Sequence, residues 1–178
     1  DIEFDAETGH VNRVTAGDNT PYQDYIKIQN RATDMSRRAI EKLIPVAERC
    51  GVVIALENVW NDLWVKPKLF AQFVKSFDSP WVQTYFDIGN HVKYAAPQEW
   101  IRALGDTIVK IHVKDFVVDR AASRGGKFVD IRDGDVNWPD VMKTLDQIGY
   151  VGWFTIEGSR GLSHAEQNRR LEMILAAK

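Results

Sequence analysis

Four side chains of metal-binding type stand at the ends of four apolar stretches of this chain. Each stretch is typical of a buried strand, and the four end, in order, at Glu57, Asp87, His112 and Glu157. A helical pattern follows each of them, and in parallel sheets built from alternating strands and helices the carboxyl ends of the strands share one edge. Two Glu, one Asp and one His that meet there suit one divalent metal, such as Mn²⁺, Mg²⁺, Co²⁺ or Zn²⁺. The pattern therefore predicts a metal site built from four successive strands.

The spacing of these four residues fits successive strand–helix units. Asp87 follows Glu57 by 30 residues and His112 follows Asp87 by 25, which is one unit each. The 45 residues from His112 to Glu157 are more than one unit needs, because segment 114–137 is inserted. A single acidic residue at a strand end is also typical of a surface cap or of a cap for the next helix. Four metal-binding side chains in a row favour a shared site.

The composition is ordinary for one globular domain, spanning residues 1–178, with a formal net charge of −2 and 44% hydrophobic residues. The near-neutral charge gives no support for a nucleic-acid or membrane-surface partner, and no apolar run approaches the ~18 residues of a membrane span. The single cysteine, Cys50, excludes an internal disulfide and fits a reducing compartment, so we expect a cytoplasmic protein. The chain opens without Met in a polar stretch, which looks like the interior of a longer protein.

Hydrophobic periodicity divides the chain into a leading helix and four strand–helix pairs. Residues 1–21 are expected to form a loop, with a short extended piece at 9–14, and residues 22–178 to form the strand–helix units. The segment 114–137, rich in charges and glycines, is expected to be irregular. The predicted helices span 22–50, 67–76, 97–105, 139–148 and about 164–176, and the predicted strands span 52–57, 82–87, 108–113 and 153–157.

This order of elements predicts an α/β fold with a parallel sheet and right-handed crossovers. An open doubly wound sheet and part of a (β/α)₈ barrel both fit it. A complete barrel usually needs ~250 residues, so a barrel would be incomplete here, with about four strands and five helices of its C-terminal part. Exposed strand edges invite aggregation or pairing with another chain, and a homo-oligomer is one form this could take.

Several segments resemble those of the xylose-isomerase-like TIM-barrel superfamily. They are ALENVWN, YFDIGN, KIHVKDF, the stretch 134–158 and the predicted first helix with the residues next to it. Within that superfamily the chain is similar to the sugar phosphate isomerase/epimerase group, which includes L-ribulose-5-phosphate 3-epimerases, D-tagatose 3-epimerases and hydroxypyruvate isomerases. The resemblance extends from about Pro21 onward and corresponds to the second half of such barrels.

The resemblance implies that Glu57, Asp87, His112 and Glu157 hold one divalent metal. It implies an isomerase or epimerase of a sugar or sugar phosphate, in which protons move through a metal-bound enediolate. Glu57 and Glu157 would be acid and base as well as ligands, while Asp87 and His112 would mainly be ligands. A 3-epimerase and an aldose–ketose isomerase would use similar residues, and the choice between them stays open.

Further residues near the predicted strand ends could contact the substrate. Asn58 and Asn90 follow metal ligands and could bind sugar hydroxyls or orient the carboxylates. Trp60 could wall the pocket against a sugar face or pack on neighbouring loops. Asp115 could accept a hydrogen bond from a ligand or substrate, or cap a loop. Tagatose-epimerase-like relatives carry His where this chain has Asn90, so that subgroup's substrate contacts do not transfer fully.

Two arginines lie where barrels of this kind often bind phosphate. Arg120 belongs to the long segment after His112, and Arg160 lies just before the last helix. They could clamp a phosphate or only solvate a loop. Two other readings stay open beside the isomerase: an endonuclease IV-like DNA repair enzyme, which needs three zinc ions and extra histidines, and a non-catalytic barrel fragment.

Overall fold

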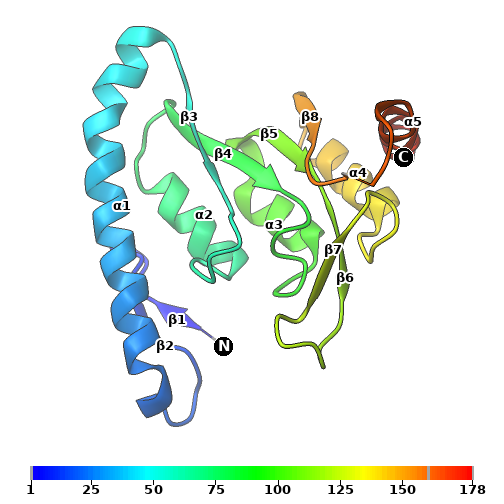
Figure 1. The fold of residues 1–178 in the computed structure, drawn as a ribbon. Coiled ribbons are helices and arrows are strands. Elements are labelled where there is room, and N and C mark those ends of the chain that lie inside the picture. The colour runs from blue at the N-terminus through cyan, green and yellow to red at the C-terminus, as the bar shows by residue number, and fades with distance from the viewer. Residues whose placement is uncertain (1, 160, 178) are drawn as a thin grey trace.

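The structure, a computed structural model, describes residues 2–159 and 161–177. Its centre is a parallel sheet whose four strands lie side by side in chain order: β3 (Ile54–Glu57), β4 (Val82–Asp87), β5 (Ile108–Val113) and β8 (Trp153–Ile156). The helices are α1 (Gln23–Cys50), α2 (Pro67–Lys75), α3 (Pro97–Leu104), α4 (Trp138–Gln147) and α5 (His164–Leu175). Helices α2, α3 and α4 lie along one face of the sheet, and α1 stands beyond α2 (Figure 1). The α/β fold with four parallel strands and five helices is confirmed.

Local sequence sets the ends of these elements, which agree with the predicted bounds to within two residues. Proline stands in the first turn of α2, α3 and α4, where its fixed φ suits a helix and its missing N–H costs nothing. The side chains of Asn137 and Ser163 cap α4 and α5 by accepting hydrogen bonds from the N–H groups of Asp140 and Glu166, each at 3.3 Å. Strong local signals therefore fix where these helices begin.

The segment 114–137 is not irregular throughout, and that prediction is wrong. It holds an antiparallel hairpin of β6 (Asp115–Val118) and β7 (Gly126–Val129). Phe116 and Phe128 pair across it, with ring centroids 5.1 Å apart. At Gly126, where φ is 138°, a Cβ would collide with the carbonyl oxygen of Val117, so only glycine fits. Charged residues in the turn hide this pairing in the sequence.

The leading segment also contains strands. β1 (Glu3–Phe4) and β2 (Val11–Arg13) pair antiparallel, and β2 falls within the extended piece predicted at 9–14. A short 3₁₀ helix, Thr20–Tyr22, leads into α1, and a second one, Gly105–Thr107, leads from α3 into β5.

The hydrophobic core lies between the sheet and the helices. Along β4, Val82, Thr84 and Phe86 are buried on the helix side, whereas the alternating Gln83 and Tyr85 are partly exposed on the other face. The largest core side chains come from the sheet and the covering helices: Phe70, Phe86, Trp100, Ile101, Leu104, Ile111, Leu145 and Ile174. Apolar packing closes one face of the sheet and leaves the other face, where the candidate ligands lie, open.

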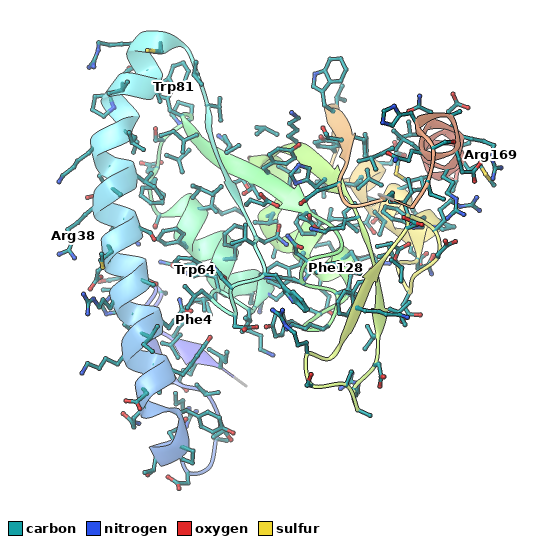
Figure 2. The ribbon with its side chains drawn as sticks, viewed as in Figure 1. Phe4, Arg38, Trp64, Trp81, Phe128 and Arg169 are labelled. Atoms are coloured by element: carbon teal, nitrogen blue, oxygen red, sulfur yellow. The ribbon has the colours of Figure 1, made fainter. Side chains whose placement is uncertain are left out.

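Helix α1 is held through a small number of contacts. Ile40 packs with Phe73 and Trp64, and the Trp64 ring stacks on Phe73 with centroids 4.8 Å apart. Trp64 lies among the side chains between α1 and the sheet (Figure 2). The buried Gln29 side chain accepts a hydrogen bond from the Trp64 N–H at 3.1 Å. Among the described residues, no helix is both long and apolar enough to cross a membrane.

Candidate metal centre

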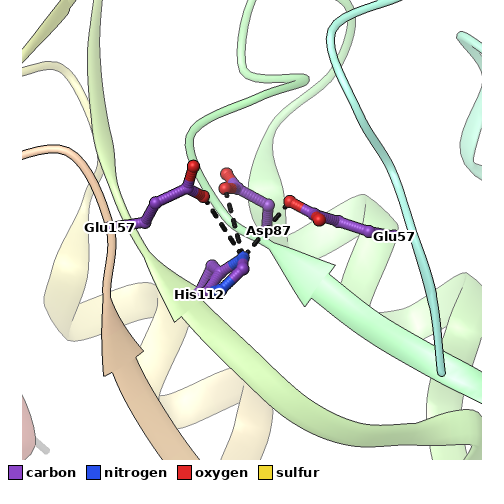
Figure 3. Close-up of side chains that lie close together, drawn as sticks. All are labelled: Glu57, Asp87, His112 and Glu157. Atoms are coloured by element: carbon purple, nitrogen blue, oxygen red, sulfur yellow. Dashed lines mark hydrogen bonds and ion pairs between the residues drawn. The ribbon is translucent and has the colours of Figure 1, made fainter.

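The structure brings the four predicted ligands together at one end of the sheet (Figure 3). Glu57 and Asp87 end β3 and β4, His112 lies near the end of β5, and Glu157 directly follows β8. Each residue offers one oxygen or nitrogen atom, and these atoms all lie within 4.8 Å of one another. That metal binds to them stays a prediction, but the geometry it requires is present.

His112 lies at the centre of this group. Its Nδ1 atom is 3.2 Å from Oε1 of Glu57, 3.2 Å from Oε2 of Glu157 and 3.8 Å from Oδ2 of Asp87. All three carboxylates therefore face one imidazole nitrogen. A neutral imidazole and carboxylate oxygens are a donor set that first-row divalent cations accept.

Strand register explains the convergence. Asp87 and His112 are direct partners in the parallel pairing of β4 with β5. The N–H of Glu157 donates to the carbonyl oxygen of Val113 at 3.1 Å, which carries the pairing of β5 with β8 one residue further. The ring of Tyr85 lies against the His112 ring, with centroids 3.9 Å apart. The sheet thus sets both the position and the tilt of the histidine.

Two asparagines hold Asp87 in place. The Asn58 side chain donates to the carbonyl oxygen of Asp87 at 2.8 Å and accepts from its N–H at 2.7 Å. The Asn90 N–H donates to Asp87 Oδ1 at 2.8 Å, and the Asn90 amide lies 3.5 Å from Glu57 Oε1. Of the two roles predicted for these asparagines, these contacts favour orientation of the carboxylates.

A fifth side chain, the charged Lys114, belongs to the same cluster and was missed by sequence reasoning. Lys114 Nζ is 3.2 Å from Glu157 Oε1 and 3.7 Å from Asp87 Oδ2. The available signal is the period of two along a strand, because Lys114 follows His112 by two residues and so shares its face of the sheet. Lysine is not a metal ligand, so a search for ligand types does not single it out.

The pKa values of the two neighbouring carboxyl groups are shifted in opposite directions. Burial raises the pKa of Asp87 well above its usual value; the Lys114 ammonium opposes this rise, and the Glu157 carboxyl group adds to it. Burial would also raise the pKa of Glu157. However, the neighbouring Asp87 carboxyl group and the ammonium of Lys114 together hold that pKa below its usual value. When both acids are ionised, a positive partner between them would reduce their repulsion.

The cluster fits a divalent cation on two further grounds. Oδ2 of Asp87 and Oε2 of Glu157 are buried, and neither has a hydrogen-bond partner among the described residues. Buried oxygens without a donor are costly, and a cation between them would remove that cost. In addition, the three carboxylates and the Lys114 ammonium leave two negative charges, which one divalent cation would balance.

The other residues predicted to contact the substrate belong to the loops around this centre. Trp60, half-buried in the loop after Glu57, packs against Phe128 of the hairpin with ring centroids 4.8 Å apart. Lys93 Nζ lies 4.4 Å and the Arg124 guanidinium carbon 4.0 Å from the Trp60 ring centre. Trp60 therefore joins the β3 loop to the β6–β7 hairpin, whichever face it presents to a substrate.

Asp115 is fully buried, and its carboxylate is engaged by its own loop. The donors are the N–H groups of Phe116, Arg132 and Val136 and the indole N–H of Trp138, at 2.9 to 3.2 Å. Burial nevertheless raises the pKa of Asp115. Arg120 lies exposed in the turn of the hairpin, and Arg160 lies outside the described residues. Contacts of Asp115, Arg120 and Arg160 with a substrate stay predictions.

A cavity of about 410 Å³ adjoins the centre on the Lys114 side. Its lining combines one ammonium, two carboxylates, an aromatic ring and two glycines, together with an aliphatic side chain: Lys114, Phe128, Val129, Asp130, Asp133, Gly158 and Gly161. A cavity of this size with mixed polar and aromatic walls can take a small polyhydroxylated molecule.

Comparison with known proteins places the chain in a family. It belongs to the xylose isomerase-like TIM-barrel family, whose profile matches residues 2–174. An L-ribulose-5-phosphate 3-epimerase of Escherichia coli is 28% identical over 159 residues, which cover 88% of this chain and 52% of that protein. The chain thus spans about half the length of this curated relative. The family resemblance seen in the sequence is confirmed.

Solved structures support the fold. A D-tagatose 3-epimerase-like protein superposes with a TM-score of 0.70 at 23% identity, covering 89% of this chain and 57% of the other. A xylose isomerase-like TIM-barrel protein from Mycobacterium smegmatis, in complex with magnesium, gives a TM-score of 0.65 at 20% identity, covering 93% and 55%. At these identities the likeness concerns the fold, and it confirms an α/β arrangement that forms part of a TIM barrel.

Proposed function

We propose that this chain carries the metal centre of a divalent-metal-dependent isomerase or epimerase acting on a sugar or sugar phosphate. The observation that carries the proposal is the convergence of Glu57, Asp87, His112 and Glu157 on one point, with two buried oxygens that lack donors. The family, and an Escherichia coli relative named as a 3-epimerase, support the reaction class.

The two glutamates are suited to move protons. Glu57 and Glu157 approach the centre from opposite sides (Figure 3), so a substrate between them would meet a carboxylate on each face. One can remove a proton from a carbon beside the carbonyl group, and the other can return a proton. Asp87 and His112 complete the binding site. When bound, a divalent cation supplies Lewis-acid stabilisation of the negative charge that develops on the substrate oxygens.

The neighbouring residues would then shape the substrate site. We assign Asn58 the role of holding Asp87 in place, because the nitrogen and the oxygen of its side-chain amide both form hydrogen bonds with the main chain of Asp87. Asn90, which orients the carboxylates of Asp87 and Glu57, and Trp60, in the loop after β3, would also contact the sugar. Asp115 would keep the loop before α4 in place. Arg120 and Arg160 are the candidates for a phosphate group, if the substrate carries one.

The test measures metal uptake and proton exchange together. The protein is incubated in D₂O with Mn²⁺ and, separately, with L-ribulose 5-phosphate and D-tagatose, the sugars in the names of its relatives. We expect a single bound metal and deuterium entering the ketose, at C3 for a 3-epimerase or at C1 for an aldose–ketose isomerase, as read by NMR. A protein that takes up no metal would contradict the proposal. Metal uptake without exchange would support the centre and exclude these two sugars.

A further inference from the structure

The two glutamates of the centre differ in what holds their oxygens. Glu157 Oε2 faces His112 Nδ1 at 3.2 Å, whereas its other oxygen, Oε1, lies 3.2 Å from Lys114 Nζ. In Glu57 the oxygen that faces His112, Oε1, is the same one that lies 3.5 Å from the Asn90 amide. Among the described residues, only Glu157 of the two glutamates has a charged donor, the Lys114 ammonium, beside the oxygen that does not face His112. The two carboxylates are therefore not equivalent.

We propose that Lys114 is a positioning residue that separates the two oxygens of Glu157. Its ammonium holds Oε1 and thereby keeps Oε2 turned toward the cation position between His112 and Asp87. This inference rests on the proposed function and deepens it, because it assigns a role within the same centre to a residue that cannot itself be a ligand while it carries its proton.

The position of Lys114 is fixed from more than one side. Its side chain is only 13% exposed, and Nζ lies 4.6 Å from the centre of the Phe128 ring. Its main chain packs against Gly89, where a Cβ would lie 2.9 Å from the Lys114 carbonyl oxygen. Glycine at position 89 thus lets the loop after Asp87 pass directly beside the end of β5. A lysine confined in this way loses little further freedom when it pairs with Glu157.

The charge of Lys114 has a second consequence. It lies close to Asp87 Oδ2 as well as to Glu157, so it reduces the negative potential that attracts a cation. Replacing the ammonium with a neutral side chain should tighten metal binding while it releases Oε1 of Glu157. Tighter binding with a changed ligand arrangement is the opposite of what a general loss of structure would produce.

The experiment follows Co²⁺ binding by its visible absorption, which reports ligand arrangement without any substrate. In Lys114→Met we expect Co²⁺ to bind about tenfold more tightly, because a nearby positive charge is removed. We also expect the absorption spectrum to change, because both oxygens of Glu157 become free to approach the ion. In the D₂O assay, exchange should slow by roughly 10–100-fold, with a much smaller change in KM.

Lys110→Met is the matched control. Lys110 lies on the same face of β5, and its Nζ is 5.0 Å from the ring centre of Tyr85. This variant loses the same charge from the same strand but keeps the pair of Lys114 with Glu157, so its Co²⁺ spectrum should match that of the unmodified protein. Lys114→Arg keeps the charge and should bring metal affinity back toward the original value. Lys114→Gln, smaller in volume, serves if circular dichroism shows that Lys114→Met does not fold.

The outcomes are distinct. A spectrum and an affinity that are unchanged in Lys114→Met would overturn the positioning role, as would the same changes appearing in Lys110→Met. If the unmodified protein takes up no Co²⁺ or Mn²⁺, the proposed function itself fails, and this inference fails with it. Metal uptake by the unmodified protein, together with an altered spectrum confined to Lys114 variants, supports both.

Discussion

Burial has opposite effects on free energy on the two faces of the parallel sheet, and two neighbouring residues of β4 show this. Phe86 and Asp87 are neighbours on this strand and are 1% and 0% exposed. Phe86 points to the helices and gains free energy from leaving water. Asp87 points to the candidate metal centre, where burial of its carboxylate costs free energy.

The difference teaches that stability and chemistry are carried by separate sides of the same strands. On the helix side, Phe86, Ile111 and Val113 are enclosed by apolar side chains, which need no particular partner atom. On the other side, Asp87 depends on the Asn58 amide, which bonds its main chain, on the N–H of Asn90, which donates to its carboxylate, and on the charge of Lys114. Changes on the helix side should therefore alter unfolding, and changes on the open side should alter metal binding and turnover.

The largest effect should come from the open side. In Glu57→Gln and in Glu157→Gln, we expect turnover to fall by about 10³-fold or more, roughly 4 kcal/mol in the barrier, because an amide cannot exchange the proton. Urea unfolding should show a stability close to that of the unmodified protein. Exposed Glu48 on α1 supplies the control, since Glu48→Gln should change neither quantity. Full turnover in both site variants would rule out the mechanism with two carboxylates.

The next effect should appear on the helix side. Phe86→Ala removes a ring that is 1% exposed and leaves a cavity in the core, so we expect the free energy of unfolding to fall by about 3–5 kcal/mol. The folded fraction should still bind Co²⁺ with the original spectrum. Val151, which is 98% exposed, offers a comparison, because Val151→Ala removes apolar atoms that are already in water. A changed Co²⁺ spectrum in Phe86→Ala would show that the two faces are not separable.

The division between the faces also explains which features the sequence could predict. Proline at positions 67 and 97 and the apolar residues of β4 are local signals, and the corresponding elements match the predicted bounds to within one residue. The convergence of the four candidate ligands could be predicted because each ends its own apolar stretch. In the β6–β7 hairpin, Phe116 pairs with Phe128 across a charged turn. No local sequence pattern predicts this pairing.

Features that depend on two distant residues were beyond reach for the same reason. Lys114 belongs to the centre because it pairs with Glu157, which lies 43 residues later in the chain, directly after β8. Asn58 could be named as a candidate from its position beside Glu57, but its partner is the main chain of Asp87, and main-chain partners leave no trace in residue types. The sequence predicts what each strand carries, whereas the contacts between strands require the structure.

A smaller effect should follow from replacing Asn58, the asparagine that bonds the main chain of Asp87. Asn58→Ala leaves the N–H and the carbonyl oxygen of Asp87 without partners, so we expect a loss of about 3 kcal/mol in unfolding free energy. Metal affinity should weaken by roughly tenfold or more, because Asp87 is no longer held.

The chain contains a matched control for this change. Asn30 makes the same paired contacts with the N–H and carbonyl oxygen of Val11, at 2.7 and 3.1 Å, away from the centre on β2. Asn30→Ala should cost stability and leave metal affinity unchanged. Equal metal affinities in the two variants would mean that Asn58 does not act on the site.

The smallest predicted effect concerns His91, where the two regions meet. His91 packs on Trp100 of the core, with ring centroids 4.8 Å apart, and its Nε2 lies 3.1 Å from the carbonyl oxygen of Val59 in the loop after Glu57. Burial lowers the pKa of His91 from 6.5 to about 4. The folded state therefore binds fewer protons than the unfolded state between these values. Its stability is complete above pH 6.5 and is lost as the pH falls toward 4.

The expected loss between pH 7 and pH 5 is about 2 kcal/mol from this group, measured by urea unfolding at both pH values. Carboxyl groups of the centre also titrate as the pH falls, so the informative quantity is the difference between the unmodified protein and His91→Gln. The amide keeps a hydrogen-bond donor but cannot take a proton, and its stability should vary less with pH by that amount. An identical pH dependence in both proteins would show that burial does not lower the pKa of His91.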